Sequence, residues 1–191
     1  MAAVNCSRVF FPGFSLFAPS LVQDCINACV KLDRQQFIQH LEVPVMIAEA
    51  RRAGLTFTAD QTRLIKREKK TPLARDLIRA GNQLPVLAVR QQQLGPQGQV
   101  RVGRSNENDL VIKDDTVSSR HAVLQKNDRT GTYDIHDLAS MNGTWVNGSR
   151  LVVGKSVVLF DGDVIGFGDT VFLFFYPAGL YDVLKANIGS L

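Results

Sequence analysis

The sequence predicts an all-β sandwich over residues 84–177, preceded by a small α-helical region over residues 1–83. In the second half, short β-rich runs recur at close spacing with turn residues between them, which is typical of a sandwich. In the first half, apolar residues recur at helical spacing instead. Residues 178–191 are expected to form a short C-terminal helix and tail. At 191 residues, the chain can bury a core without disulfides or a metal.

Two helices are expected early in the helical region. Apolar residues between Leu21 and Val30 fall on one face of a helix. Asp33 and Gln36 have the spacing of a capping box, in which each side chain accepts a hydrogen bond from the other residue's backbone N–H. We expect Pro44 to end or kink the helix that they begin.

Two further helical segments are expected before the sandwich. The first, over residues 64–70, ends in the run Lys-Arg-Glu-Lys-Lys. Such a run is most often a solvated helix face, and a phosphate or lipid contact is the alternative. The second begins with Thr71 as its N-cap and Pro72 in its first turn, and it ends just before Gly81.

The strands are expected where apolar and β-branched residues cluster between turn residues. Asn-Gly, Asp-Asp, Asp-Gly and Gly-Asp pairs lie between the runs. A short terminal helix is expected over residues 181–186. The expected strands are residues 85–89, 100–102, 110–112, 122–124, 133–135, 144–146, 151–153, 157–160, 164–167 and 171–176.

The net charge of +4 resides in one half of the chain. Residues 1–83 carry a net +5 and residues 84–191 a net −1. A basic protein often binds nucleic acid or an acidic membrane surface. Because the sandwich half is almost neutral, we expect no nucleic-acid partner for it.

The three cysteines, Cys6, Cys25 and Cys29, do not form a disulfide framework. Cys25 and Cys29 lie one helical turn apart on an apolar face, so core thiols are favoured over a metal pair. A zinc site would need two more ligands, and only three histidines are present to supply imidazoles. We therefore expect no metal and no cofactor.

The apolar stretch Val9–Val22 superficially resembles a secretory signal. Two prolines, a glycine and a serine interrupt it, and no small-x-small cleavage site precedes Cys25. It is also too short and broken to span a bilayer. A cytoplasmic protein without a membrane span is expected.

Three polar segments in the sandwich half lie at the ends of expected strands, where binding loops cluster. They are Gly103-Arg104 with the polar turn after it, Ser118-Ser119-Arg120-His121, and Met141-Asn142-Gly143. The planar arginine side chain and the serine hydroxyls can donate hydrogen bonds to an oxyanion. The asparagine amide can both donate to and accept from a peptide backbone. Each also has a simpler explanation: a surface arginine, turn-forming serines, and an Asn-Gly hairpin turn.

In this order and spacing, the three segments resemble the signature of the forkhead-associated (FHA) domain, over roughly residues 84–177. That signature is Gly-Arg, then Ser-x-x-His, then Asn-Gly, and Trp145 with Asn147-Gly148 continues it. The resemblance implies a β-sandwich of about eleven strands that binds phosphothreonine peptides and is not an enzyme.

The resemblance also implies roles for individual residues. Arg104 and Ser118 would contact the phosphate, and Asn142 would hold the peptide main chain. Ser119 stands where the family often has Arg or Asn, so one phosphate contact could be lost unless Arg120 supplies it. Met141 would form part of the wall.

Three residues of the signature are assigned structural roles. His121 would brace the loops, because no third group at a recognisable spacing completes a nucleophile with Ser118. Gly103 and Gly143 would serve turn geometry. No catalytic residue is predicted.

The expected function is a phosphothreonine-binding adaptor in Ser/Thr kinase signalling, with kinases or their substrates as partners. A scaffold that assembles without phosphate is the alternative. An enzyme in the helical half is disfavoured, because that half has no Walker loop, kinase signature or metal-ligand spacing.

Overall fold

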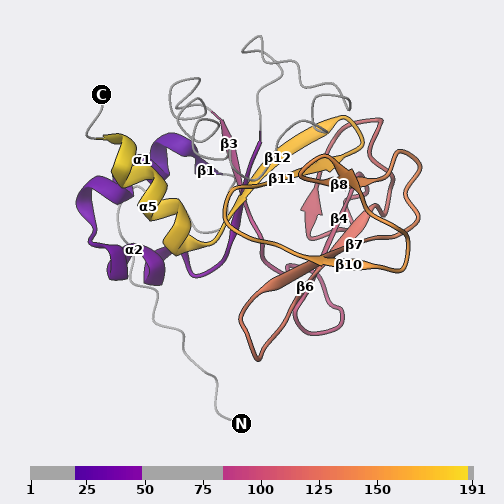
Figure 1. Cartoon of the computed structure of the whole chain (residues 1–191), viewed down its shortest axis with the longest axis horizontal. Helices are drawn as coiled ribbons and strands as arrows, with labels where there is room; N and C mark the ends of the chain where they lie inside the picture. The colour runs from indigo at the N-terminus through magenta and orange to yellow at the C-terminus, as the bar shows by residue number, and fades with distance from the viewer. Residues whose placement is uncertain (1–19, 49–83, 189–191) are drawn as a thin grey trace.

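The computed structural model describes residues 20–48 and 84–188 of the chain, which form two β-sheets and three helices. One sheet has seven strands in the order β1-β3-β2-β12-β11-β8-β9, and the other has five in the order β10-β7-β6-β4-β5. The helices α1, α2 and α5 lie together on one side, at the left in Figure 1. The strands are β1 (Ser20–Leu21), β2 (Val45–Ala48), β3 (Pro85–Ala88), β4 (Gln99–Gly103), β5 (Leu110–Val111), β6 (Ala122–Lys126), β7 (Tyr133–Asp137), β8 (Thr144–Val146), β9 (Ser149–Arg150), β10 (Ser156–Val158), β11 (Asp163–Phe167) and β12 (Thr170–Phe175).

The helices that fall in the described residues are confirmed. Helix α1 spans Val22–Lys31 and α2 spans Arg34–Leu41, where Asp33 and Gln36 form the expected capping box. The terminal helix α5, Pro177–Ile188, is longer than expected at both ends. Segments 64–70 and 71–81, Cys6, and the apolar stretch up to residue 19 lie outside the described residues.

The expected strand at residues 151–153 is the one wrong prediction among the strands. The strand forms earlier, as β9 (Ser149–Arg150), and the chain then turns at Gly154, whose φ of +79° favours glycine. Leu151 is buried, whereas Val152 and Val153 face solvent, so residues 151–153 do not form a strand at the edge of the sheet.

Two strands come from the region predicted to be helical, the two-residue β1 at the end of the seven-stranded sheet and the longer β2 within it. Strand β2 (Val45–Ala48) follows Pro44 and lies between β3 and β12 in the seven-stranded sheet. Its pairing runs from Val45↔Phe175 to Ala48↔Phe172. The helical region therefore contributes a central strand to the sandwich, and the domain boundary expected at residue 83 stays a prediction.

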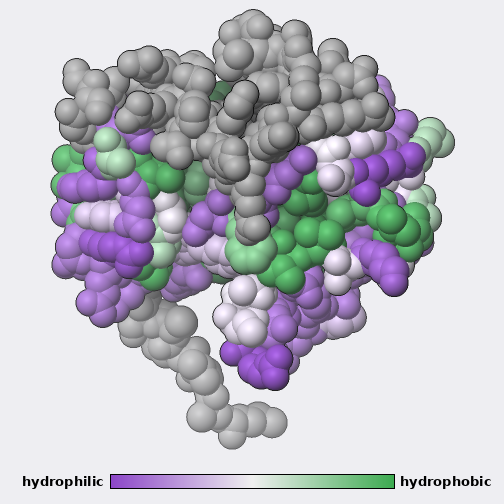
Figure 2. All heavy atoms as spheres, viewed as in Figure 1, coloured by the Kyte–Doolittle hydropathy of each residue, from purple (hydrophilic) through white to green (hydrophobic). Residues whose placement is uncertain are grey.

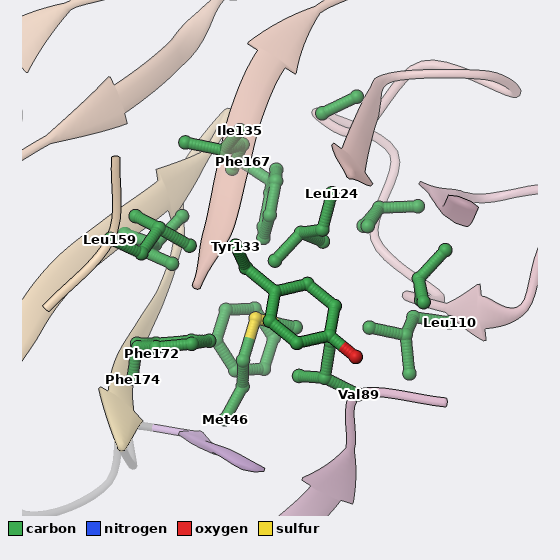
Figure 3. Close-up of a cluster of buried hydrophobic side chains, with 14 of the residues drawn as sticks. Met46, Val89, Leu110, Leu124, Tyr133, Ile135, Leu159, Phe167, Phe172 and Phe174 are labelled. Carbon is green, nitrogen blue, oxygen red and sulfur yellow. The ribbon is translucent and has the colours of Figure 1, made fainter. Parts of the chain in front are cut away.

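The seven-stranded sheet is buried on both faces. Toward the five-stranded sheet, it packs residues such as Ile165, Phe172 and Phe174 into the sandwich core shown in Figure 3. On the opposite face, Leu173 and Phe175 pack under the helices together with Phe37, Cys25, Cys29, Leu180 and Leu184. This explains why β11 and β12 are continuous apolar runs rather than alternating ones.

Helix α5 is fixed to the N-terminal helices by specific contacts. Arg34 Nε and Nη2 donate to the two carboxylate oxygens of Asp182 at 2.8 and 3.0 Å. The rings of Phe37 and Tyr181 lie 5.4 Å apart between their centroids.

Burial raises the pKa of Cys25 to about 12, so this thiol stays protonated and packs as an apolar group.

Candidate functional site

The register of three strands brings the polar segments together at one end of the five-stranded sheet. Val102 of β4 pairs with Ala122 of β6, and Ala122 pairs with Asp137 of β7. The loop after β4, the loop before β6 and the loop after β7 therefore meet at the same edge. The sequence-predicted residues Gly103, Arg104, Ser118, Ser119, Arg120, His121, Met141, Asn142 and Gly143 all lie on these loops or at their strand ends.

Hydrogen bonds join the loop after β4 to the loop before β6. The Arg104 and Ser105 amides donate to the carbonyl oxygens of Ser118 and Ser119 at 3.0 and 3.2 Å. The buried Asn108 side chain donates to Ser119 O at 2.7 Å, and Arg104 Nε donates to Val117 O at 3.2 Å. A Cβ at Gly103 would collide with the Ser119 carbonyl, so glycine is required for this close approach.

The guanidinium of Arg104 is half-exposed at the mouth of these loops. Its side chain is 47% exposed, and Nη1 lies 3.4 Å from Asp115 Oδ1. Within the described residues, Nη2 makes no hydrogen bond. One edge of the guanidinium is thus fixed by protein and the other faces solvent, as an anion-binding arginine requires.

Ser118 connects the loop before β6 to the loop after β7. Its Oγ accepts from the Met141 amide at 3.0 Å, which leaves the hydroxyl hydrogen to donate to a ligand. The neighbouring side chains of Ser119 and Arg120 are exposed. In the described residues, no hydrogen bond joins Arg120 to Arg104, Ser118 or Asn142, so its contact with phosphate stays a prediction.

Asn142 is held in place from the opposite loop. Its Nδ2 donates to Thr116 O at 2.8 Å, which leaves a second amide hydrogen and Oδ1 for a ligand. Met141 beside it is 86% exposed, the most exposed large apolar side chain of this edge. Gly143 has a φ of +81° and lies against Arg150, where a Cβ would collide.

His121 is fully buried behind the loops and bonds to two of them. Its Nδ1 accepts from the Ser118 amide at 3.0 Å, so Nε2 carries the hydrogen and donates to Gly143 O at 3.1 Å. Burial lowers the pKa of His121 below its usual value, which keeps the ring neutral. This geometry supports the bracing role and leaves no open nitrogen for catalysis.

A buried carboxylate fixes the loop after β7. Asp137 accepts from the Ser140 amide, the Ser140 hydroxyl and the Thr144 hydroxyl, the last two at 2.6 Å. Burial alone would raise the pKa of Asp137, but these hydrogen bonds outweigh it and hold the pKa below its usual value. Ala139 in this loop has a φ of +59°, which is unfavourable for alanine and is imposed by these bonds.

Sequence reasoning missed three residues of this edge. Asp115 was interpreted only as part of an Asp-Asp turn pair, and Lys113 and Thr116 were not singled out. Lys113 Nζ donates to Arg104 O at 3.1 Å and to Asn106 Oδ1 at 2.6 Å, so it lies beside the same arginine. Each acts through a contact between segments distant in sequence, which no local pattern reveals.

The described residues contain no group of His, Cys, Asp and Glu side chains arranged to hold a metal. In the same residues, no helix has the length and apolar content to cross a membrane. What the edge presents is a preformed set of hydrogen-bond donors around one half-exposed arginine.

Residues 100–168 match the family model for the FHA domain. This chain contains an FHA domain. The transcriptional regulatory protein EmbR of Mycobacterium tuberculosis is 42% identical over 82 residues, which is 42% of this chain and 20% of EmbR. An oxoglutarate dehydrogenase inhibitor of Corynebacterium diphtheriae is 39% identical over 66 residues, 35% of this chain and 43% of that protein.

Solved FHA structures also match part of this chain. A structure of M. tuberculosis EmbR in complex with a low-affinity phosphopeptide is 35% identical, with a TM-score of 0.38, and the match covers 48% of this chain and 21% of that one. The FHA domain of an Arabidopsis thaliana protein is also 35% identical, with a TM-score of 0.41, and here the match covers 48% of this chain and 73% of that one. The match spans less than half of each curated relative named above.

Proposed function

We propose that this FHA domain binds phosphothreonine peptides at the edge formed by the three loops, and that the chain acts as a non-enzymatic adaptor in Ser/Thr kinase signalling. Kinases or their phosphorylated substrates would be its partners. The observation that carries the proposal is the convergence of the Arg104 guanidinium, the Ser118 hydroxyl and the Asn142 amide on loops already joined by hydrogen bonds. EmbR, which this chain resembles in sequence, has been solved with a phosphopeptide.

Each ligating residue has a separate task in this proposal. Arg104 and Ser118 hold the phosphate, with Ser119 and Arg120 exposed beside them. Asn142 holds the peptide main chain next to the phosphothreonine. Because the loops are fixed before binding, little ordering entropy is lost when the peptide arrives.

The strength of binding follows from the number of donors. Charge-assisted hydrogen bonds contribute about 1.5–3 kcal/mol each. Three of them give roughly 5–9 kcal/mol before the cost of association, which is compatible with micromolar affinity. The threonine methyl adds about 0.8 kcal/mol, or roughly fourfold over phosphoserine.

The deciding experiment is calorimetric titration of the full chain with a phosphothreonine peptide and its unphosphorylated twin. We expect the wild type to bind only the phosphorylated peptide and Arg104→Ala to lose that binding at least a hundredfold, because an arginine–phosphate pair is removed. Arg129→Ala, at the far turn between β6 and β7, is the matched control and should bind as the wild type does. Undiminished binding by Arg104→Ala would refute the site.

A phosphate-independent scaffold is the second candidate, and one observation favours it. Apolar side chains are exposed on the sandwich half of the molecule (Figure 2). Around the edge strand β10 they are Val152, Val153, Val157, Val158 and Phe160, with exposed fractions of 38–67%. Unprotected edge strands can pair with other chains. Equal binding of phosphorylated and unphosphorylated partners would support this alternative.

A further inference from the structure

Asp115 places a carboxylate against the arginine that the proposed function assigns to phosphate. Its Oδ1 lies 3.4 Å from Arg104 Nη1, and its own side chain is fully exposed. The contact joins a residue of the loop before β6 to the end of β4. A phosphate that uses Nη1 must therefore displace this carboxylate or lie directly beside it.

The backbone on either side of Asp115 is fixed, so the carboxylate stays near the pocket. The Asp114 side chain accepts from the Thr116 amide at 2.9 Å, and the Asp114 carbonyl accepts from the Val117 amide at 3.0 Å. Thr116 O in turn accepts from Asn142 at 2.8 Å. Asp115 thus lies on the tight turn between the phosphate-binding arginine and the asparagine that would hold the peptide.

Two further aspartates lie close to Asp115 on this side of the rim. Asp114 precedes it, and the amide of Asp169 donates to Thr116 Oγ1 at 3.0 Å, which places that acidic residue at the same turn. The nearby cation Lys113 is engaged by Arg104 O and Asn106 Oδ1. A peptide crossing from Arg104 to Asn142 therefore passes a carboxylate.

We propose that Asp115 selects phosphothreonine peptides with a basic residue next to the phosphothreonine. This inference rests on the proposed phosphothreonine binding. The phosphate takes the solvent-facing edge of Arg104 at Nη2, and the Asp115 carboxylate beside it pairs with the basic side chain of the peptide. An acidic side chain in the same place adds repulsion from Asp115 and weakens binding.

The size of the effect is modest because the pair is exposed. Two unit charges about 4 Å apart in water-like surroundings change an equilibrium about fivefold. An exposed ion pair is also weakened by salt. We expect about a fivefold preference for arginine over a neutral residue at one flanking position, and a smaller preference at higher salt.

The test uses the full chain and phosphothreonine peptides in which arginine or glutamate replaces a neutral residue at each flanking position in turn. Asp115→Asn keeps the shape of the side chain and removes its charge. The matched control is Asp128→Asn, an exposed aspartate at the turn between β6 and β7, at the other end of that hairpin. Thermal unfolding confirms that each variant folds as the wild type does.

We expect Asp115→Asn to bind the neutral phosphopeptide a few-fold more tightly and to lose the arginine preference, whereas Asp128→Asn changes neither. Wild-type selectivity retained in Asp115→Asn would overturn this inference while leaving phosphothreonine binding intact. If the wild type bound no phosphopeptide, the proposed function would fail, and this inference with it.

Discussion

The two faces of the seven-stranded sheet are both buried, but they serve the molecule differently. The face toward the five-stranded sheet packs Phe167, Phe172 and Phe174 into the sandwich core, and the ring of Phe167 lies 5.6 Å from that of His121 in the site. The opposite face packs Leu173 and Phe175 under α1, α2 and α5, in a cluster that includes none of the predicted site residues. The helices therefore contribute to stability by completing a hydrophobic core. The loops of the site are held instead by buried polar hydrogen bonds.

The largest expected effect is a loss of stability when either of two neighbouring β12 residues, which point to opposite faces of the sheet, is replaced by alanine. Phe174→Ala and Phe175→Ala should each lower the free energy of unfolding by about 3–5 kcal/mol, because each empties a fully packed site. If the helices were only a loosely attached appendage, Phe175→Ala would behave as a surface substitution, within about 0.5 kcal/mol. Urea unfolding of both variants measures the difference, and a mild Phe175→Ala would contradict the two-core description.

A smaller effect is expected from the buried polar bonds of the site. Thr144→Val keeps the side-chain shape and removes the hydroxyl that donates to Asp137. The free energy of unfolding should fall by about 1.5–3 kcal/mol, the usual contribution of a hydrogen bond to a charged group. Phosphopeptide affinity should fall as well, because the loop carrying Met141 and Asn142 is anchored there.

Thr130→Val, on the exposed turn between β6 and β7, is the control for the hydroxyl. It should change neither stability nor affinity by a measurable amount. Loss of stability in Thr144→Val with unchanged peptide affinity would show that the loop keeps its conformation without Asp137.

The sequence predicted the strands that carry the site loops better than the strands that pack under the helices. Strand patterning located β4, β6, β7 and β8, and the ends of these strands place Arg104, Ser118 and Asn142 at one edge. The strand Val45–Ala48 was missed, because a four-residue apolar run after a helix has no period that separates strand from helix. Its sheet position depends on Phe172–Phe175, over a hundred residues later.

Within the site, side-chain types were predictable and their pairings were not. An arginine before a polar turn indicates an anion site, whereas its contact with Asp115 depends on how two separate loops fold together. Likewise, the burial of Asp137 with Ser140 and Thr144 follows from the packing of β7 against β6. Local patterns carry no information on such contacts.

The smallest expected effect is the loss of stability in mild acid, which depends on His121 on the site side and on His40 on the helix side. Burial lowers the pKa of both below the ordinary 6.5. The unfolded chain therefore takes up protons first as pH falls below about 6.5, and the free energy of unfolding decreases with them. Asp137 and Asp109, whose pKa values are also lowered, act only near and below their ordinary value of 3.8.

Urea unfolding between pH 7.5 and 5 should show this decrease, and His121→Gln and His40→Gln should each remove part of the pH slope. The slope is the readout, since a substitution at fully buried His121 also lowers stability at every pH. Phosphopeptide binding should weaken in His121→Gln and persist in His40→Gln, because only His121 connects Ser118 to Gly143. An unchanged slope in His121→Gln would mean that His121 has the same pKa in the folded and unfolded states, which would contradict the lowered pKa that burial gives it.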